Sequence, residues 1–263
     1  MTVSTRSAWA AGSLAPRPGA APALTMWWAQ ARTELRLLLR NGEQVLLSLV
    51  VPLGLLVVLV TLDVVEVDRP GVARVDFFTP GLIALAVMST AFTGQAIATG
   101  FERQYGVLKR LGATALPRHV LLLAKTTSVL LVELLQLVLL GAVAYALGWD
   151  PAGSVLSVLA FVVLGTAAFS GLGLLLGGTL RGLTCLAVAN LAWMVLLVLG
   201  GILFDLDAFG AAEPVLRLLP SAALAGGLRS SLVDGALVGT HLVTLAVWAV
   251  VSLAAAGRAF RWE

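Results

Sequence analysis

Six predominantly apolar stretches of about 20 residues follow one another along this chain. A helix of that length crosses the hydrocarbon core of a bilayer while satisfying its backbone groups internally. Pro52 and Pro80 fall inside the first two stretches, where neighbouring helices or water can satisfy the backbone groups freed by a kink. We predict transmembrane helices at Val45–Leu62, Phe77–Thr99, Val120–Leu147, Ser154–Thr179, Leu183–Phe204 and Ala236–Ala256.

The composition agrees with a lipid membrane as the surroundings of the chain. Hydrophobic residues make up 59% of the 263 residues and charged residues only 12%, whereas a soluble domain is about a quarter charged. The basic residues are spread over several loops rather than gathered in one dense patch, which argues against a nucleic-acid partner. The single cysteine, Cys185, excludes a cysteine-cluster metal site. We expect an all-α polytopic membrane protein with no catalytic, cofactor or metal site.

The two ends of the chain are predicted to lie on one side of the membrane. Residues 1–24 are rich in Ala, Pro, Ser and Gly and lack a continuous apolar core, so we expect a disordered tail rather than a signal peptide. A single transmembrane domain would then span residues 25–263. Most of the 17 lysines and arginines fall on one side if the N-terminus is inside. We therefore predict a multi-pass protein of the cell (plasma) membrane with both termini in the cytoplasm.

A basic amphipathic helix is predicted before the first span, where residues 26–44 read MWWAQARTELRLLLRNGEQ. Apolar side chains line one side of this helix, and the other side carries a four-residue repeat: Trp28, Arg32, Arg36 and Arg40. Such a helix lies in the membrane interface. Two interpretations remain open: a simple anchor before the membrane, or a lever that also contacts a cytoplasmic partner.

The segment between the last two spans, residues 205–235, predicts two short helices. Pro214 suits a helix start, Pro220 breaks the pattern, and Ser221 can cap the second helix. We expect a re-entrant pair in the outer leaflet, with an ordinary surface loop as the alternative. The expectation rests on the apolar residues that require burial, which are Val215, Leu216, Leu218, Leu219, Leu224 and Leu228.

The most polar stretch in the middle of the chain is FERQYGVLKRLGATALPRH, residues 101–119. It predicts a short amphipathic helix from Glu102 to Leu111, in which Gly106 permits a turn, and Pro117 ends the segment. One interpretation is a basic cytoplasmic loop without a partner. The other is a docking helix that presents Tyr105, Val107 and Leu108 to a soluble protein, because aromatic and aliphatic anchors ringed by charge are typical of contact patches.

Residues 101–125 resemble the signature of ABC-2 type transporter permeases, the membrane subunits of ABC exporters of the daunorubicin-resistance kind. The family pattern is roughly Glu-Arg-Glu-x-Gly-x-Leu, then Arg-Leu, then Thr-Pro-x-x-Arg and a later Lys. This chain departs from it at Gln104 and Ala115, and Pro117 stands near the usual proline. It supplies Glu102, Arg103, Gly106, Leu108, Arg110, Leu111, Thr114, Arg118 and Lys125.

The resemblance implies an export permease that pairs with a second permease chain, identical or paralogous. Relatives of this kind move drugs, lipids, polysaccharides or other molecules, and we expect a hydrophobic or amphipathic substrate, drug or lipid-like, because the sequence has no large extracellular domain to handle polymers. ATP and Mg²⁺ would be bound by separate ATP-binding cassette ATPase subunits, with no cofactor on this chain. Neither of the two lysines, Lys109 and Lys125, lies in a glycine-rich phosphate loop, so we expect a transport subunit rather than an enzyme. The resemblance assigns the ATPase coupling helix to Glu102, Arg103, Tyr105, Gly106, Val107, Leu108, Arg110 and Leu111.

Polar residues inside the predicted spans are candidates for the substrate path. Glu133, Gln136 and Asn190 lie within apolar runs, and an ionisable group in a membrane is a functional hypothesis by default. A structural hydrogen bond between helices is the alternative for each. Gly173 and Gly177 have the spacing of a close helix contact, within the chain or between subunits. A secondary transporter that uses Glu133, and a membrane scaffold or lipid enzyme, remain the alternative functions.

Overall fold

The computed structural model describes residues 20–62, 65, 67, 71–203 and 206–260. These residues form an all-helical membrane domain in which no β-strand occurs. Most of the tail expected over residues 1–24 lies outside the described residues. The first helix, α1 (Ala23–Arg40), begins directly after Pro22, which supplies an extended backbone at the helix entrance.

Five helices are long and apolar enough to cross a membrane among the described residues. The first is a continuous helical run from Arg74 to Gln104. A further helix, α2 (Gly42–Thr61), occupies the place of the first predicted span, although its apolar part, Ser48–Thr61, is shorter. The polytopic helical architecture is therefore confirmed, while α2 as a sixth span stays a prediction. The other four long helices are α6 (Arg118–Ala146), α7 (Val155–Thr179), α8 (Gly182–Leu199) and α11 (Gly239–Ala259).

The run from Arg74 to Gln104 is the central helix of the bundle. In its most apolar stretch 89% of the residues are buried, whereas the corresponding share in α8 is 17%. It is not the single regular helix that the sequence predicts. A wide π-helical segment, η1 (Met88–Gly94), separates α3 (Arg74–Val87) from α4 (Gln95–Gln104). Such segments re-aim the side chains that follow them, and they are frequent at functional sites.

Glycines on α7 allow this helix to lie directly against the central helix. A Cβ atom on Gly173 would stand 2.7 Å from the carbonyl oxygen of Phe92, and one on Gly177 would stand 2.7 Å from that of Ala96. No side chain fits at these distances from backbone atoms. The close contact expected from the Gly173–Gly177 spacing is thus a contact within the chain, between α7 and the η1–α4 part of the central helix.

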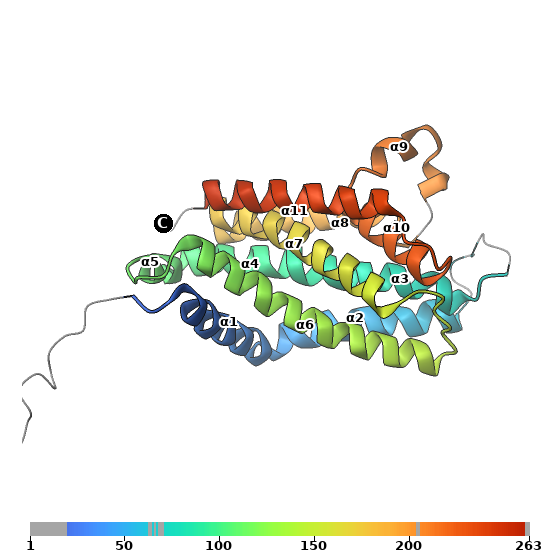
Figure 1. The fold of residues 1–263 in the computed structure, drawn as a ribbon, viewed down its shortest axis with the longest axis horizontal. Coiled ribbons are helices and arrows are strands. Elements are labelled where there is room, and N and C mark those ends of the chain that lie inside the picture. The colour runs from blue at the N-terminus through green and yellow to red at the C-terminus, as the bar shows by residue number, and fades with distance from the viewer. Residues whose placement is uncertain (1–19, 63–64, 66, 68–70, 204–205, 261–263) are drawn as a thin grey trace, which may run out of the picture.

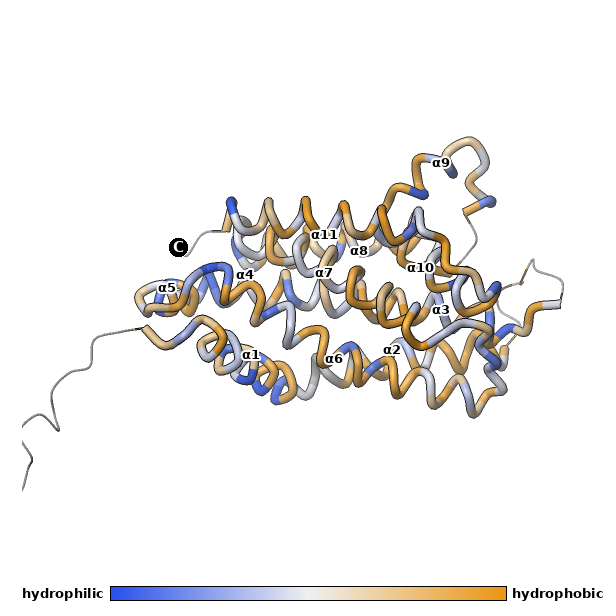
Figure 2. Tube along the Cα trace, in the orientation of Figure 1, coloured by the Kyte–Doolittle hydropathy of each residue, from blue (hydrophilic) through white to orange (hydrophobic). Residues whose placement is uncertain are grey.

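The bundle has two distinct ends (Figure 1). The start of α1, the end of α11 and the short helix α5 (Val107–Gly112) lie at one end, and helices α9 (Glu213–Leu216) and α10 (Pro220–Leu232) lie toward the other. Figure 2 shows hydrophobic residues along most of the bundle and hydrophilic residues concentrated at its ends and along α1. This distribution fits helices that cross a membrane and expose their polar ends to water.

The segment expected to form a re-entrant pair contains a 3₁₀ turn, η2 (Leu206–Ala212), and the two helices α9 and α10. Pro214 lies in the first turn of α9, as predicted. Pro220, expected to stand before the second helix, is instead the first residue of α10. The expected cap was wrong, because Leu219 occupies the cap position of α10 and Ser221 lies inside the helix.

Only the second helix of this pair is packed into the bundle. Leu224 and Leu228 of α10 are fully buried, whereas Val215 of α9 and Leu218 just after it are 69% and 63% exposed. Burial by the chain itself is thus limited to α10, whereas α9 projects from the bundle in Figure 1. Insertion of this segment into the outer leaflet stays a prediction.

Candidate functional site

The polar stretch at residues 101–119 folds as the end of α4, a turn and α5. The chain turns at Gly106, whose φ of 71° lies in the left-handed region that favours glycine. The position that a Cβ atom would take at Gly106 has no neighbour within 4 Å. Glycine is therefore required here by the backbone conformation and not by lack of space. Pro117 precedes α6 directly and ends the segment as predicted.

Fewer apolar side chains are exposed on this turn than the sequence predicts. Tyr105 is 67% exposed and Val107 is 38% exposed, and the ring of Tyr105 stacks on Phe101 with centroids 6.0 Å apart. The expectation that Leu108 is presented to a partner was wrong, because its side chain is fully buried. A six-residue helix needs an apolar anchor to stay folded, and Leu108 supplies it. The anchor cluster contains Leu108, Leu121, Leu122, Leu174, Ala256 and Phe260.

The other residues assigned to the coupling helix divide between the interior and the surface. Arg110 is exposed, and Leu111 packs partly against the cluster that holds Leu108. Arg103 reaches back to the bundle, where its Nη1 donates to the carbonyl oxygen of Leu180 at 3.3 Å. Glu102 points away from the exposed side of the turn and toward Lys125 of α6.

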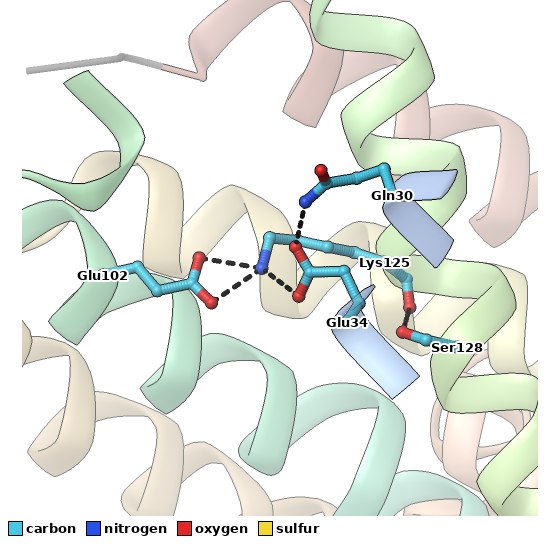
Figure 3. A network of polar contacts seen from close by, with 5 residues as sticks. All are labelled: Gln30, Glu34, Glu102, Lys125 and Ser128. Carbon is cyan, nitrogen blue, oxygen red and sulfur yellow. Dashed lines mark hydrogen bonds and ion pairs between the residues drawn. The ribbon is translucent and has the colours of Figure 1, made fainter. Parts of the chain in front are cut away.

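Lys125 joins three helices through a buried ion triad (Figure 3). Its Nζ lies 2.9 Å from Glu34 Oε2 on α1 and 2.8 Å from Glu102 Oε1 on α4. Gln30 Nε2 donates to the second oxygen of Glu34 at 2.7 Å. Lys125 is only 4% exposed, so its charge depends on these carboxylates. The triad ties the amphipathic helix and the end of the central helix to one spanning helix.

Sequence reasoning missed the two ion pairs, although a signal was present. Lys125 lies inside the predicted third span, and a charged residue at such a place needs a partner. Glu34 lies between the arginines of α1, on the buried side of the helix with Ala31. Glu34 and Lys125 are 91 residues apart along the chain, so their contact could not be inferred from the sequence.

The predicted amphipathic character of α1 agrees with the structure. The side that bears Trp28, Arg32, Arg36 and Arg40 is exposed. On the opposite side, Ala31 and Glu34 are buried against the bundle, and Trp27 Nε1 donates to Thr127 Oγ1 of α6 at 3.2 Å. Contact of the exposed side with lipid stays a prediction.

The three candidates for the substrate path do not form one site. Glu133 is 2% exposed and accepts a hydrogen bond from Thr166 of α7, while its Oε1 has no hydrogen-bond partner. Gln136 Nε2 donates to Thr90 Oγ1 at 3.1 Å and to the carbonyl oxygen of Ser48 at 3.2 Å. These contacts join helices of the same chain.

Asn190 lies apart from the other two candidates, on the exposed side of α8. The structure therefore places Glu133 and Gln136 in the interior of the chain and Asn190 on its surface. A surface position on an outer helix suits contact with lipid or with another chain, and not a shared polar site with Glu133.

Groups of three or more metal-ligating side chains are absent from the described residues. The geometry supports a contact site rather than a site of chemical reaction. An exposed turn at one end of the bundle is anchored by Leu108, and Glu102 connects it to Lys125 of α6 and, through Lys125, to α1. The chemistry of the turn is that of a contact surface, because a ring and an aliphatic side chain stand beside the exposed cations of Lys109 and Arg110.

Comparison with known proteins identifies the kind of chain that carries this arrangement. A search of individually characterised proteins found no match. A family model described as ABC-2 type transporter matches residues 25–233, which is well over half of the chain and includes most of α1, the Gly106 turn and the ion triad. The protein is thus a membrane permease component of an ABC transporter, and the chain belongs to the ABC-2 type transporter family.

Proposed function

We propose that this chain is the permease subunit of an ABC exporter and that separate ATP-binding cassette subunits dock on the turn formed by Tyr105, Gly106 and Val107. The observation that supports docking most directly is the exposed pair Tyr105 and Val107 on a turn that is anchored from beneath by the buried Leu108. Exposed apolar groups held on a rigid support are the usual anchors of a protein interface.

The surface of the turn also defines the partner's complementary surface. Lys109 and Arg110 are exposed on α5 beside the two anchors. We infer an apolar cleft on the ATPase that receives Tyr105 and Val107, bordered by carboxylates that face the two cations. The ATPase would hold ATP and Mg²⁺, and this chain would hold neither.

The remaining parts of the proposal concern the assembly and the substrate. Two permease chains, identical or paralogous, would enclose the path in the plasma membrane, with both termini and α5 on the cytoplasmic side. The position of α5 at the same end as the start of α1 and the end of α11 supports this sidedness. A hydrophobic or amphipathic substrate, drug or lipid-like, suits a chain whose described spans are mainly apolar.

The two tyrosines of the chain allow a matched test of docking. Tyr105 and Tyr145 are 67% and 76% exposed, and Tyr145 lies near the opposite end of α6 from Lys125. The permease is co-expressed with its ATPase, and co-purified ATPase and ATP-driven uptake of a fluorescent amphiphile into inside-out vesicles are measured. We expect Tyr105→Ala to lose both signals and Tyr145→Ala to keep them. Full retention of both by Tyr105→Ala would place docking elsewhere.

A further inference from the structure

A groove of about 260 Å³ opens between α1, α4 and α6 near the α5 end of the bundle. Each of the three helices contributes one side of it. The lining residues are Glu34, Leu37 and Leu38 from α1, Gln95, Ala98, Thr99, Phe101 and Glu102 from α4, and Lys125, Ser128 and Val129 from α6. Tyr105 and Val107 also line it. The groove therefore lies directly beside the ion triad and differs from the polar contacts around Glu133.

The charged residues of the groove leave a formal excess of one negative charge. Among the described residues that line it, the only charged side chains are Glu34, Glu102 and Lys125. Lys125 lies within 2.9 Å of both carboxylates, and one ammonium group balances only one of them. A ligand with a positive charge is favoured in such surroundings, because a low-dielectric environment strengthens its attraction to the second carboxylate.

Two buried polar side chains in the groove have no hydrogen-bond partner. Gln95 is 5% exposed with both Nε2 and Oε1 unpaired, and Thr99 is fully buried with an unpaired Oγ1. Buried polar groups are nearly always hydrogen-bonded, and an unpaired one is destabilising by about 1–3 kcal/mol. Both line the groove, so a ligand with a donor and an acceptor would satisfy them.

The spacing of these groups sets the length of the ligand. Gln95, Thr99 and Glu102 recur at intervals of four and three residues on one face of α4. At 1.5 Å per residue, Gln95 and Glu102 are separated by roughly 10 Å along the helix. The groove thus offers a carboxylate at one end, an amide at the other, and a hydroxyl between them.

The walls between these polar groups suit an apolar stem. Leu37, Leu38, Phe101 and Val129 line the groove together with the exposed ring of Tyr105. The stacked rings of Phe101 and Tyr105 lie near the carboxylate end, where an aromatic face also attracts a cation.

We propose that this groove binds an alkylammonium ligand whose amine is held at Glu102 and Glu34, and whose apolar stem carries a hydrogen-bonding group to Gln95 and Thr99. An amine-bearing lipid head group and a free cationic amphiphile share this chemistry. The site lies on this chain alone and does not require the ATPase, so it can fail or hold independently of the docking proposal.

The test is saturation binding of a fluorescent amine to the full-length permease in phosphatidylcholine nanodiscs. Dansylcadaverine carries a primary amine, a five-carbon stem and a sulfonamide, and its N-acetylated form is the same molecule without the charge. We expect the amine to bind at least tenfold more tightly than the acetylated form. Equal binding of the two probes would overturn the proposal and leave water as the partner of Gln95.

Variants then locate the binding. Gln95→Leu should weaken binding of the amine roughly five- to tenfold, while Gln104→Leu, the same change in an exposed residue of α4 outside the groove lining, should match the wild type. Glu102→Gln keeps the shape of the side chain and should remove the preference for the amine over the acetylated probe. Unchanged binding in both Gln95→Leu and Glu102→Gln would refute the site.

A second set of nanodiscs separates the two sources of the ligand. Phosphatidylethanolamine, which bears an amine, replaces part of the phosphatidylcholine at constant probe concentration. Competition in the wild type that disappears in Gln95→Leu identifies a lipid head group as the occupant. Absence of competition, with the amine preference intact, identifies a free amphiphile as the occupant.

Discussion

Lys125 Nζ lies 2.9 Å from Glu34 Oε2, and this contact joins a spanning helix to the amphipathic helix α1 across 91 residues of sequence. Because Lys125 also pairs with Glu102 at the end of α4, movement of the turn at Gly106 is linked to α1 through one ammonium group. A buried ion pair is weak support for stability. Its position beside the proposed docking turn suggests a role in fixing the relative positions of three helices.

Replacing Lys125 alone should destabilise the protein strongly. Lys125→Met leaves Glu34 and Glu102 buried without a counter-charge, which typically costs about 3–5 kcal/mol. The triple variant Lys125→Met, Glu34→Gln, Glu102→Gln removes all three charges and should recover most of that loss. Heat-induced unfolding in detergent, followed by tryptophan fluorescence, measures the difference. Equal melting temperatures for the single and triple variants would contradict the triad as a mutually dependent unit.

A methyl group at Gly177 should separate α7 from the central helix. The Cβ atom of Gly177→Ala would stand 2.7 Å from the carbonyl oxygen of Ala96, and overpacking of this kind costs about 1–3 kcal/mol. Gly54 of α2 is the control, since a Cβ atom there meets nothing within 4 Å. We expect a lower melting temperature for Gly177→Ala and no loss for Gly54→Ala. A melting temperature of Gly177→Ala equal to that of the wild type would exclude this packing.

The fold was predictable where one physical constraint acts on consecutive residues. The bilayer thickness fixes the length of apolar runs, and the missing N–H of proline placed Pro214 at a helix start. Helical spacing showed that Leu108 belongs to an apolar side, but not that this side faces the bundle. The partners of Lys125 were not predictable, because contacts between distant segments leave no periodic signal.

The groove illustrates the same limit within one helix. Gln95, Thr99 and Glu102 share a face because α4 is a regular helix, and this helix begins where the π-helical segment η1 ends at Gly94. Neither Ser, Thr nor Gly in that segment marks a π-helix by propensity alone. The sequence predicted a span that ends at Thr99 and a separate short helix that begins at Glu102, so the common face of these three residues beside Lys125 could be identified only from the packed structure.

Any residue other than glycine at position 106 should strain the turn. A side chain in the left-handed region costs about 1–2 kcal/mol, so Gly106→Ala should lower the melting temperature, and Gly106→Asn should lower it less. Gly257→Ala is the opposite control, because this exposed glycine lies inside α11 with open space around its Cβ position and should gain helix stability. A gain for Gly106→Ala as well would show that the turn does not hold φ near 71° in solution.

Arg229 should contribute more to stability than any exposed arginine nearby. It is 5% exposed, donates to the carbonyl oxygens of Gly201 and Ile202 at 3.3 Å, and stands 4.7 Å from the ring centroid of Phe77. Arg229→Met removes both of these hydrogen bonds to buried carbonyl oxygens, at a cost of about 1–3 kcal/mol. Arg229→Lys keeps the charge but loses the planar guanidinium group, so its melting temperature should fall between those of the wild type and Arg229→Met.

The control for Arg229 is Arg217, which is 59% exposed and pairs with Glu213 on the surface of α9. An exposed ion pair contributes about 0–1 kcal/mol to stability, so the melting temperature of Arg217→Met should lie close to that of the wild type. Heat-induced unfolding of the four proteins under one condition ranks them. Arg229→Met is expected to be the least stable because α10 would lose its polar connection to the residues after α8. If Arg217→Met and Arg229→Met had equal melting temperatures, the buried arginine would have no special part in holding α10 against the bundle.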